Sequence, residues 1–200
     1  MVLKFLLDIP NAVTAIGLCF TVTALYLIDQ REYDAAICLL IWAVMLDHVD
    51  GWLARHAKDR PREYAMVGGD MDSATDMVSA AIAPASIAFS LSGTSVISLI
   101  AGLLISLAAC LRVGYFNNFG LTDAGRFHGV PLTYTVPLVG LIFMSGKFTT
   151  NIHPAEVLPW ALMAMAVLHI CPFGPPPVRG IGFLYFFLYA ATLTLCLLLL

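Results

Sequence analysis

The sequence predicts an all-α fold, a polytopic bundle of six or seven transmembrane helices with a short amphipathic lead. Of its 200 residues, 60% are hydrophobic and only 12% are charged, which is about half the charged share of a typical soluble domain. The mean hydropathy is +0.88. Because about 20 apolar residues in a helix cross a bilayer, the long runs without Asp, Glu, Lys or Arg are interpreted as spans. These runs cover residues 9–28, 77–111, 127–146, 157–178 and 180–200. The composition excludes a soluble enzyme, a disordered chain and a nucleic-acid binder.

The expected elements follow these runs along the chain. Residues 1–8 form the amphipathic lead, and the first span covers about residues 11–28. A second helix over 34–56 is apolar first and charged at its end, and a third runs from an N-cap near Asp70 to a turn at 92–95. The later helices cover about 96–117, 131–148, 156–170 and 180–200. The helix at 156–170 is short enough to be re-entrant, which leaves six or seven spans in a single domain over residues 1–200.

Lysine and arginine gather on one side of the predicted membrane. With the N-terminus inside, that side holds eight of the ten: Lys4, Arg55, Lys58, Arg60, Arg62, Arg112, Arg126 and Arg179. The other side holds only Arg31 and Lys147. Because loops rich in Lys and Arg stay in the cytoplasm, we expect a multi-pass protein of the cytoplasmic (inner) membrane with its polar chemistry on the cytoplasmic side. Lys58, Arg60 and Arg62 are interpreted as topological charges, with attraction of anionic lipid headgroups as the alternative.

Two neighbouring predicted helices each present two carboxylates. Helical spacing places Asp47 and Asp50 on one face together with the small residues Gly51 and Ala54, and Gly68, Asp72 and Asp76 share a face of the next helix. Two carboxylates ~4 Å apart repel by about 4 kcal/mol at an effective dielectric near 20. Divalent cations cancel that repulsion, and oxygen ligands suit Mg²⁺, Mn²⁺ or Ca²⁺.

Other interpretations of the same aspartates remain open. In one alternative, these aspartates lie at helix ends in the membrane–water interface and bind no ligand. Intramembrane carboxylates also mark ion paths, so a cation transporter or channel is the alternative from another functional class. The positive charge of Arg55 beside such a path would oppose cation conduction. In contrast, paired metal ions, the Arg55 side chain and the space beside small residues together suit the binding of a diphosphate group.

The pattern resembles the signature of the CDP-alcohol phosphotransferase family. The matching text is D-x-x-D-G-x-x-A-R from Asp47 to Arg55 and G-x-x-x-D-x-x-x-D from Gly68 to Asp76, preceded by P-N-x-x-T at residues 10–14. Flanking residues 72–79, 83–85, 111–117 and 127–131 are most similar to phosphatidylserine synthases of bacteria and archaea. The chain departs from the pattern in a longer stretch between Arg55 and Gly68, and in Tyr115, which stands where a second arginine is usual.

The resemblance implies transfer of a phosphatidyl group from CDP-diacylglycerol, or a similar CDP-linked lipid, to an alcohol, with L-serine favoured and CMP released. Glycerol phosphate, inositol phosphate or another amino alcohol are the alternative acceptors. It also implies a homodimer and two Mg²⁺ or Mn²⁺ ions held by Asp47, Asp50, Asp72 and Asp76, with Asp76 also the general base. The nucleotide and diphosphate residues implied are Asn11, Thr14, Asp50, Gly51, Ala54, Arg55, Gly68 and Asp72.

Four further residues are candidates for binding the acceptor or a lipid phosphate: Arg112, Asn117, Arg126 and His128. Snorkelling to the interface is the alternative for Arg112, and capping or loop hydrogen bonds are the alternative for Asn117 and His128. His48 falls on another face than the aspartates and is expected to pack. His153 and His169 are expected on the side away from the carboxylates.

Overall fold

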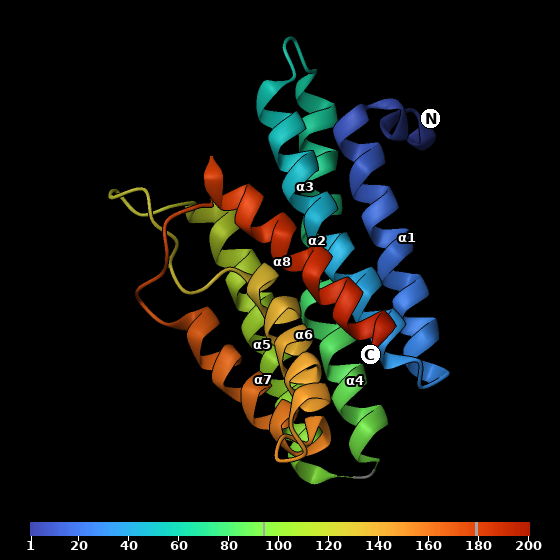
Figure 1. The fold of residues 1–200 in the computed structure, drawn as a ribbon. Coiled ribbons are helices and arrows are strands. Elements are labelled where there is room, and N and C mark those ends of the chain that lie inside the picture. Colours follow the sequence, from blue (N-terminus) through green and yellow to red (C-terminus); the bar gives the residue numbers. More distant parts are fainter. Residues whose placement is uncertain (94, 179) are drawn as a thin grey trace.

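Helices form nearly all the regular structure in the computed structural model, which describes residues 1–93, 95–178 and 180–200. Thr94, in the turn predicted at residues 92–95, and Arg179, one of the predicted cytoplasmic charges, lie outside the described residues. The described part of the chain contains no strand, so the prediction of an all-α fold is confirmed. The helices, in chain order (Figure 1), are η1 Val2–Leu7, α1 Ile9–Asp29, α2 Tyr33–His56, α3 Arg62–Met77, η2 Val78–Ile82, α4 Ala83–Ser92, α5 Val96–Phe119, η3 Leu132–Tyr134, α6 Thr135–Phe148, α7 Pro154–Ile170 and α8 Ile181–Leu199.

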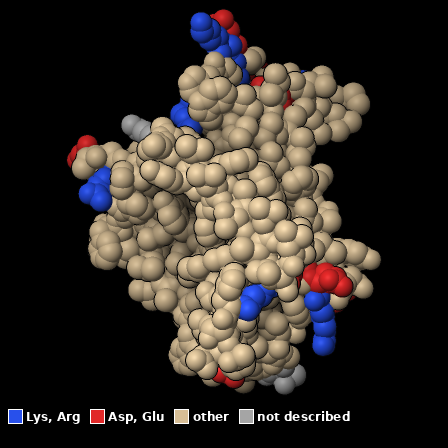
Figure 2. All heavy atoms as spheres, in the orientation of Figure 1, with Lys and Arg blue, Asp and Glu red and all other residues tan. Residues whose placement is uncertain are grey.

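The described helices form a bundle that is long and apolar enough to cross a membrane. Five stretches meet both conditions: Ile9–Asp29, Tyr33–His56, Arg62–Ser92, Val96–Phe119 and Ile181–Leu199. Two shorter apolar helices, Leu132–Phe148 and Pro154–Ile170, complete the set. On the face shown in Figure 2, Lys, Arg, Asp and Glu lie toward the two ends, and other residues form the belt between them. The chain is therefore an integral membrane protein.

Helix α7, whose short length in the sequence left open a re-entrant segment, runs alongside the whole of α6. Gly146, near the end of α6, packs against Pro154 at the start of α7. At the opposite end, Thr135 of α6 shares a hydrogen bond of 3.0 Å with the Nε2 atom of His169 in the last turn of α7. The seven-helix count is therefore the one that the described structure supports, with α3 and α4 counted as one span.

Helix α3 begins earlier than the sequence predicted. It starts at Arg62 directly after Pro61, so Asp70 lies well inside the helix, where it is exposed, and the predicted N-cap there is wrong. Hydropathy missed this start because the first turns of α3 are polar. The span then continues to Ser92 through the π-helical turn Val78–Ile82. Pro84 explains that wider turn, since it has no N–H to donate and its ring crowds the carbonyl four residues earlier.

The end of the bundle with the α2–α3 turn is called the site end here. It gathers the beginnings of α1, α3, α6 and α8 and the ends of α2, α5 and α7 (Figure 1). Asp8 caps α1 at this end by accepting a hydrogen bond of 3.5 Å from the backbone N–H of Asn11, and Pro10 lies in the first turn. At the opposite end, Lys147 forms an ion pair of 2.8 Å with Asp34.

Candidate metal and substrate site

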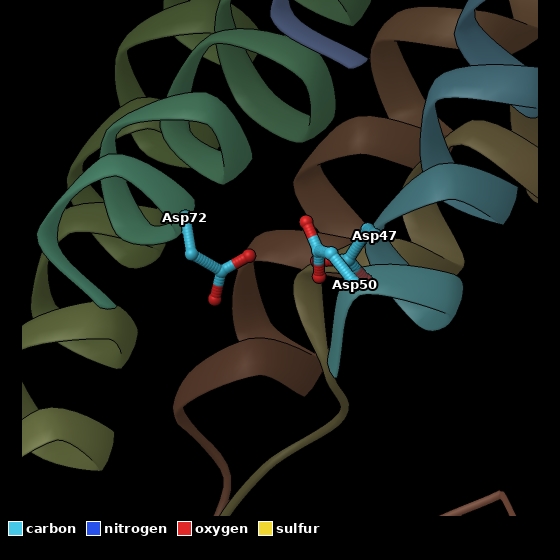
Figure 3. Close-up of side chains that lie close together, drawn as sticks. All are labelled: Asp47, Asp50 and Asp72. Carbon is cyan, nitrogen blue, oxygen red and sulfur yellow. The ribbon is translucent and has the colours of Figure 1, made fainter. Parts of the chain in front are cut away.

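Three carboxylates from two helices meet near the site end. Asp47 and Asp50 project from α2 and Asp72 from α3, and one oxygen of each lies within 4.8 Å of the others. In Figure 3, Asp72 points across the gap between the helices toward both aspartates of α2. The spacing of three residues puts Asp47 and Asp50 on the same face of α2, and the turn between α2 and α3 brings the face that carries Asp72 opposite them.

Asp50 is the most buried of these carboxylates, with a residue exposure of 5%. The Thr14 hydroxyl of α1 donates a hydrogen bond of 2.5 Å to its Oδ2 atom. Next to it on α2, the His48 ring stacks on Phe186 at a centroid distance of 5.1 Å, and its Nδ1 atom lies 2.9 Å from the Val44 carbonyl oxygen. Helix α1 therefore fixes one carboxylate directly. His48 packs as expected, but its Nδ1 atom also lies 3.4 Å from the Asp47 Oδ2 atom and the residue lines the same cavity, so the prediction that it faces away from the aspartates is wrong.

A cavity of about 410 Å³ opens beside the three carboxylates. Asp76, one turn beyond Asp72 on α3, lines it but is not one of the three clustered carboxylates. Gly51 and Arg55 line it from α2. A Cβ atom at Gly51 would lie 3.3 Å from the Arg55 Nη1 atom, so the glycine leaves the guanidinium accessible from this side of the cavity.

Arg112 of α5 also lines the cavity and is buried, with an exposure of 7%. The centre of its guanidinium lies 5.3 Å from the ring centroids of both Phe116 and Phe127. Its Nε atom has no hydrogen-bond partner among the described residues. A desolvated cation held between two aromatic rings with an unused donor favours an incoming anion.

The cavity wall beside Arg112 carries polar groups, several of which the sequence analysis did not single out. The Asn117 amide of α5 donates a hydrogen bond of 2.9 Å to the hydroxyl of Ser73 on α3, and both residues line the cavity. Thr133 and Tyr134, just before α6, complete this wall. Asn117 was a candidate from the sequence, whereas Ser73, Thr133 and Tyr134 were not. Phe116 could also have been found, because it lies four residues after Arg112, the spacing at which two side chains meet on a helix.

Several predicted nucleotide residues lie outside the cavity lining, namely Asn11, Thr14, Ala54 and Gly68. Asn11 is 1% exposed, and its side-chain amide donates to the carbonyl oxygens of Phe5 and Tyr64 at 3.0 and 3.2 Å. Thr14 contacts the carboxylate cluster only through Asp50.

Two of the predicted acceptor residues also lie elsewhere. The Arg126 Nε atom donates a hydrogen bond of 3.1 Å to the Gly174 carbonyl oxygen, in a separate surface cavity. His128 packs edge-to-face on Tyr115 and lines a second cavity of about 380 Å³ on the other side of Arg112. His169 lines that second cavity too, fully buried at the site end. The expectation that His169 lies away from the active end is therefore wrong, because α7 returns to the site end.

The donor set of the cluster fits a hard divalent cation. Asp50, Asp72 and Asp76 form no ion pair with Lys or Arg in the described ranges. Carboxylates this close repel unless a cation lies between them, and their oxygens are the ligands that Mg²⁺ and Mn²⁺ prefer. Asp47, Asp50 and Asp72 are therefore able to hold a metal ion as they stand.

The same residues fall inside a region of similarity to known proteins. The sequence profile of the CDP-alcohol phosphatidyltransferase family matches residues 7–171. An archaetidylserine synthase of Methanothermobacter thermautotrophicus is 28% identical over 176 residues, which cover 87% of this chain and 72% of that protein. The CDP-diacylglycerol–serine O-phosphatidyltransferases of Mycobacterium leprae and Mycobacterium tuberculosis are 28% and 27% identical over 150 residues, or 70% of this chain. The chain spans about half the length of these mycobacterial relatives, at 48% and 50%.

Proposed function

The chain belongs to the CDP-alcohol phosphatidyltransferase family, and on that premise we propose that it transfers a phosphatidyl group from CDP-diacylglycerol, or a similar CDP-linked lipid, to L-serine. The products are phosphatidylserine, or the corresponding serine lipid, and CMP. The observation that carries the proposal is the pairing of two opposite charges in one cavity. A cluster of carboxylates occupies one wall, and the unpartnered Arg112 guanidinium lies on another.

The carboxylate wall suits the diphosphate of the CDP-lipid. Asp47, Asp50 and Asp72 would hold Mg²⁺ or Mn²⁺ there, with Asp76 as a further ligand. When bound, such ions neutralise the diphosphate and the charge that builds on the departing CMP. Arg55 adds a cation at the mouth of the cavity, and the missing side chain of Gly51 leaves room for the nucleotide beside it.

Asp76 is proposed as the general base. It lines the same cavity as the carboxylate cluster and Arg112. The serine hydroxyl oxygen attacks the phosphorus attached to the lipid, and the Asp76 carboxylate takes the hydroxyl proton. The bond between that phosphorus and the bridging oxygen breaks, and CMP leaves with the bridging oxygen and the electron pair.

Arg112 is proposed to bind the serine carboxylate. A planar guanidinium with free N–H groups matches a carboxylate, and its burial strengthens the interaction. The Asn117 and Ser73 oxygens lie on the same wall and suit the serine ammonium group. A phosphorylated acceptor carries more negative charge and needs more cations to bind it. In the family pattern that the sequence resembles, a second arginine is usual at the position of Tyr115, and its absence here argues against such an acceptor. The names of the relatives add independent support for serine.

The site end is proposed to face the cytoplasm. It carries seven of the described Lys and Arg residues, and the opposite end carries Arg31 and Lys147. That bias is the one expected of the cytoplasmic side. A water-soluble acceptor would then reach the cavity from the cytoplasm, while the lipid tails stay in the bilayer.

An acceptor screen tests the proposal. Purified protein is incubated with CDP-diacylglycerol and Mn²⁺ or Mg²⁺, and with serine, glycerol phosphate, inositol phosphate or ethanolamine, and the lipid products are identified by mass. We expect CMP release with serine that is lost in Asp72→Asn. A preference for glycerol phosphate or inositol phosphate refutes serine as the acceptor, and no CMP release with any acceptor refutes the proposed activity.

A further inference from the structure

Arg60, in the turn between α2 and α3, is not a free surface charge. Its guanidinium donates three hydrogen bonds to the Asp8 carboxylate, the shortest of them 2.6 Å from Nη2 to Oδ2. The two side chains are each only 12% exposed. The same Nη2 atom lies 2.7 Å from the Oδ1 atom of Asn11 and 3.3 Å from the Tyr64 carbonyl oxygen. A single side chain from the turn therefore connects the beginning of α1 to the first turns of α3.

Gly68 lets α1 and α3 approach each other at this point. A Cβ atom there would overlap the Asn11 Oδ1 atom and lie 2.8 Å from the Arg60 Nη2 atom. Both donors of the Asn11 amide are used by the Phe5 and Tyr64 carbonyl oxygens, and its Oδ1 atom accepts a hydrogen bond from Arg60, so its contacts in the structure are with the protein itself. Asp8, Asn11, Arg60 and Gly68 together are called the Arg60 cluster.

The Arg60 cluster lies one turn from the proposed metal ligand Asp72 on α3, and one turn from Thr14 on α1. Gly68 precedes Asp72 by four residues on α3, a rise of about 6 Å. Asn11 precedes Thr14 by three residues on α1, and Thr14 binds Asp50 of α2. Helix α1 is thus bonded to α3 through the Arg60 cluster and to the metal-site face of α2 through Thr14.

We propose that Arg60 is a positioning residue for the metal site: by fixing α3 to α1, it holds Asp72 at its distance from Asp47 and Asp50. This inference rests on the proposed function of these carboxylates as metal ligands. Their mutual repulsion pushes α2 and α3 apart, and α3 has no side-chain cap at its beginning to anchor it. The charge-assisted hydrogen bonds of Arg60 oppose that separation. The metal-free protein therefore keeps the carboxylates close together, and less of the free energy of metal binding is lost in bringing them together.

Mn²⁺ binding to the purified full chain in detergent, without CDP-lipid or acceptor, tests the proposal. Free Mn²⁺ is followed by electron paramagnetic resonance. We expect Arg60→Gln to weaken Mn²⁺ binding about tenfold, the factor typical of losing hydrogen bonds to a charged group. In rate measurements, Arg60→Gln should need a higher Mn²⁺ concentration for half-maximal activity. Its kcat at saturating Mn²⁺ should stay within about twofold of that of the unsubstituted chain. Arg60→Lys keeps the charge but loses the planar donor pair, so its Mn²⁺ affinity should lie between those of the unsubstituted chain and Arg60→Gln.

Arg62→Gln is the matched control, because Arg62 is exposed and has no hydrogen bond or ion pair within the described residues. Asp8→Asn keeps an oxygen to cap α1 and removes the ion pair, so it tests the same contact if Arg60→Gln does not fold. The Asp8→Asn/Arg60→Gln double variant should bind Mn²⁺ no more weakly than the worse single variant.

Unchanged Mn²⁺ affinity in folded Arg60→Gln or Asp8→Asn overturns the proposal for Arg60. Asp72→Asn separates this outcome from failure of the metal site itself. If Asp72→Asn loses Mn²⁺ and the Arg60 variants do not, only the positioning role is refuted. If Asp72→Asn binds Mn²⁺ as tightly as the original chain, the proposed metal site is refuted, and the positioning role with it.

Discussion

Arg112→Gln provides the sharpest test of the proposed acceptor site. The substitution removes a buried cation, 7% exposed, from between two aromatic rings. A hydrogen bond to a charged group contributes about 1.5–3 kcal/mol, and 1.4 kcal/mol corresponds to a factor of ten. We therefore expect the KM for serine to rise between about tenfold and 150-fold, with kcat less affected because the carboxylate is bound in both the ground and transition states.

The assay compares serine with ethanolamine, which has the same hydroxyl and amine but no carboxylate. The original chain should prefer serine by its kcat/KM, and Arg112→Gln should lose most of that preference because only serine interacts with the guanidinium. CDP-lipid affinity, measured separately, should change little. Arg112→Lys should recover part of the preference, since it restores the charge without the planar fork.

Arg126→Gln is the companion variant, because the sequence made both arginines acceptor candidates. Arg126 is exposed and bonds to the Gly174 carbonyl oxygen, outside the carboxylate cavity. We expect its preference for serine over ethanolamine to match that of the original chain. If Arg112→Gln keeps the preference and Arg126→Gln loses it, the assignment of the serine carboxylate to Arg112 is refuted.

Four other variants test the remaining roles. Asp72→Asn should abolish turnover in a folded protein, and full activity of the original chain in excess chelator would contradict the metal site. Gly51→Leu should block CDP-lipid binding while Mn²⁺ still binds, so unchanged CDP-lipid affinity would count against a nucleotide beside Gly51. Thr14→Val should weaken Mn²⁺ binding about tenfold through the lost bond to Asp50, whereas loss of CDP-lipid affinity alone would make Thr14 a nucleotide contact. Asp76→Asn should keep CDP-lipid binding and lose about 10²–10⁴-fold in transfer rate, with a smaller loss at high pH. Loss of nucleotide binding as complete as in Asp72→Asn would instead make Asp76 mainly a metal ligand.

The membrane helices and the carboxylate faces were predictable because both depend on local features of the sequence. Apolar runs locate helices by length alone, and offsets of three and four residues place Asp47 beside Asp50 whatever surrounds them. The start of α3 was not predictable in this way, since residues 62–69 are too polar for a hydropathy signal. The position of His169 also depended on α7 crossing fully, which its short length left undecided.

The distinctions among the arginines depend on tertiary packing, and no property of the sequence separates them. Arg60 lies in the turn between α2 and α3, and Arg62 is the first residue of α3 only two positions later, yet Arg60 is paired with Asp8 and Arg62 is exposed. The difference arises because Gly68 admits the Asn11 side chain, which in turn offers Arg60 a second acceptor next to Asp8. The glycine that the sequence assigned to a nucleotide pocket thus contacts α1 in the structure. A Gly68→Ala variant would separate the two roles. If its role is helix contact, the added methyl group should weaken Mn²⁺ binding in the absence of any nucleotide. If its role is the pocket, Mn²⁺ binding should be unchanged and only CDP-lipid affinity should fall.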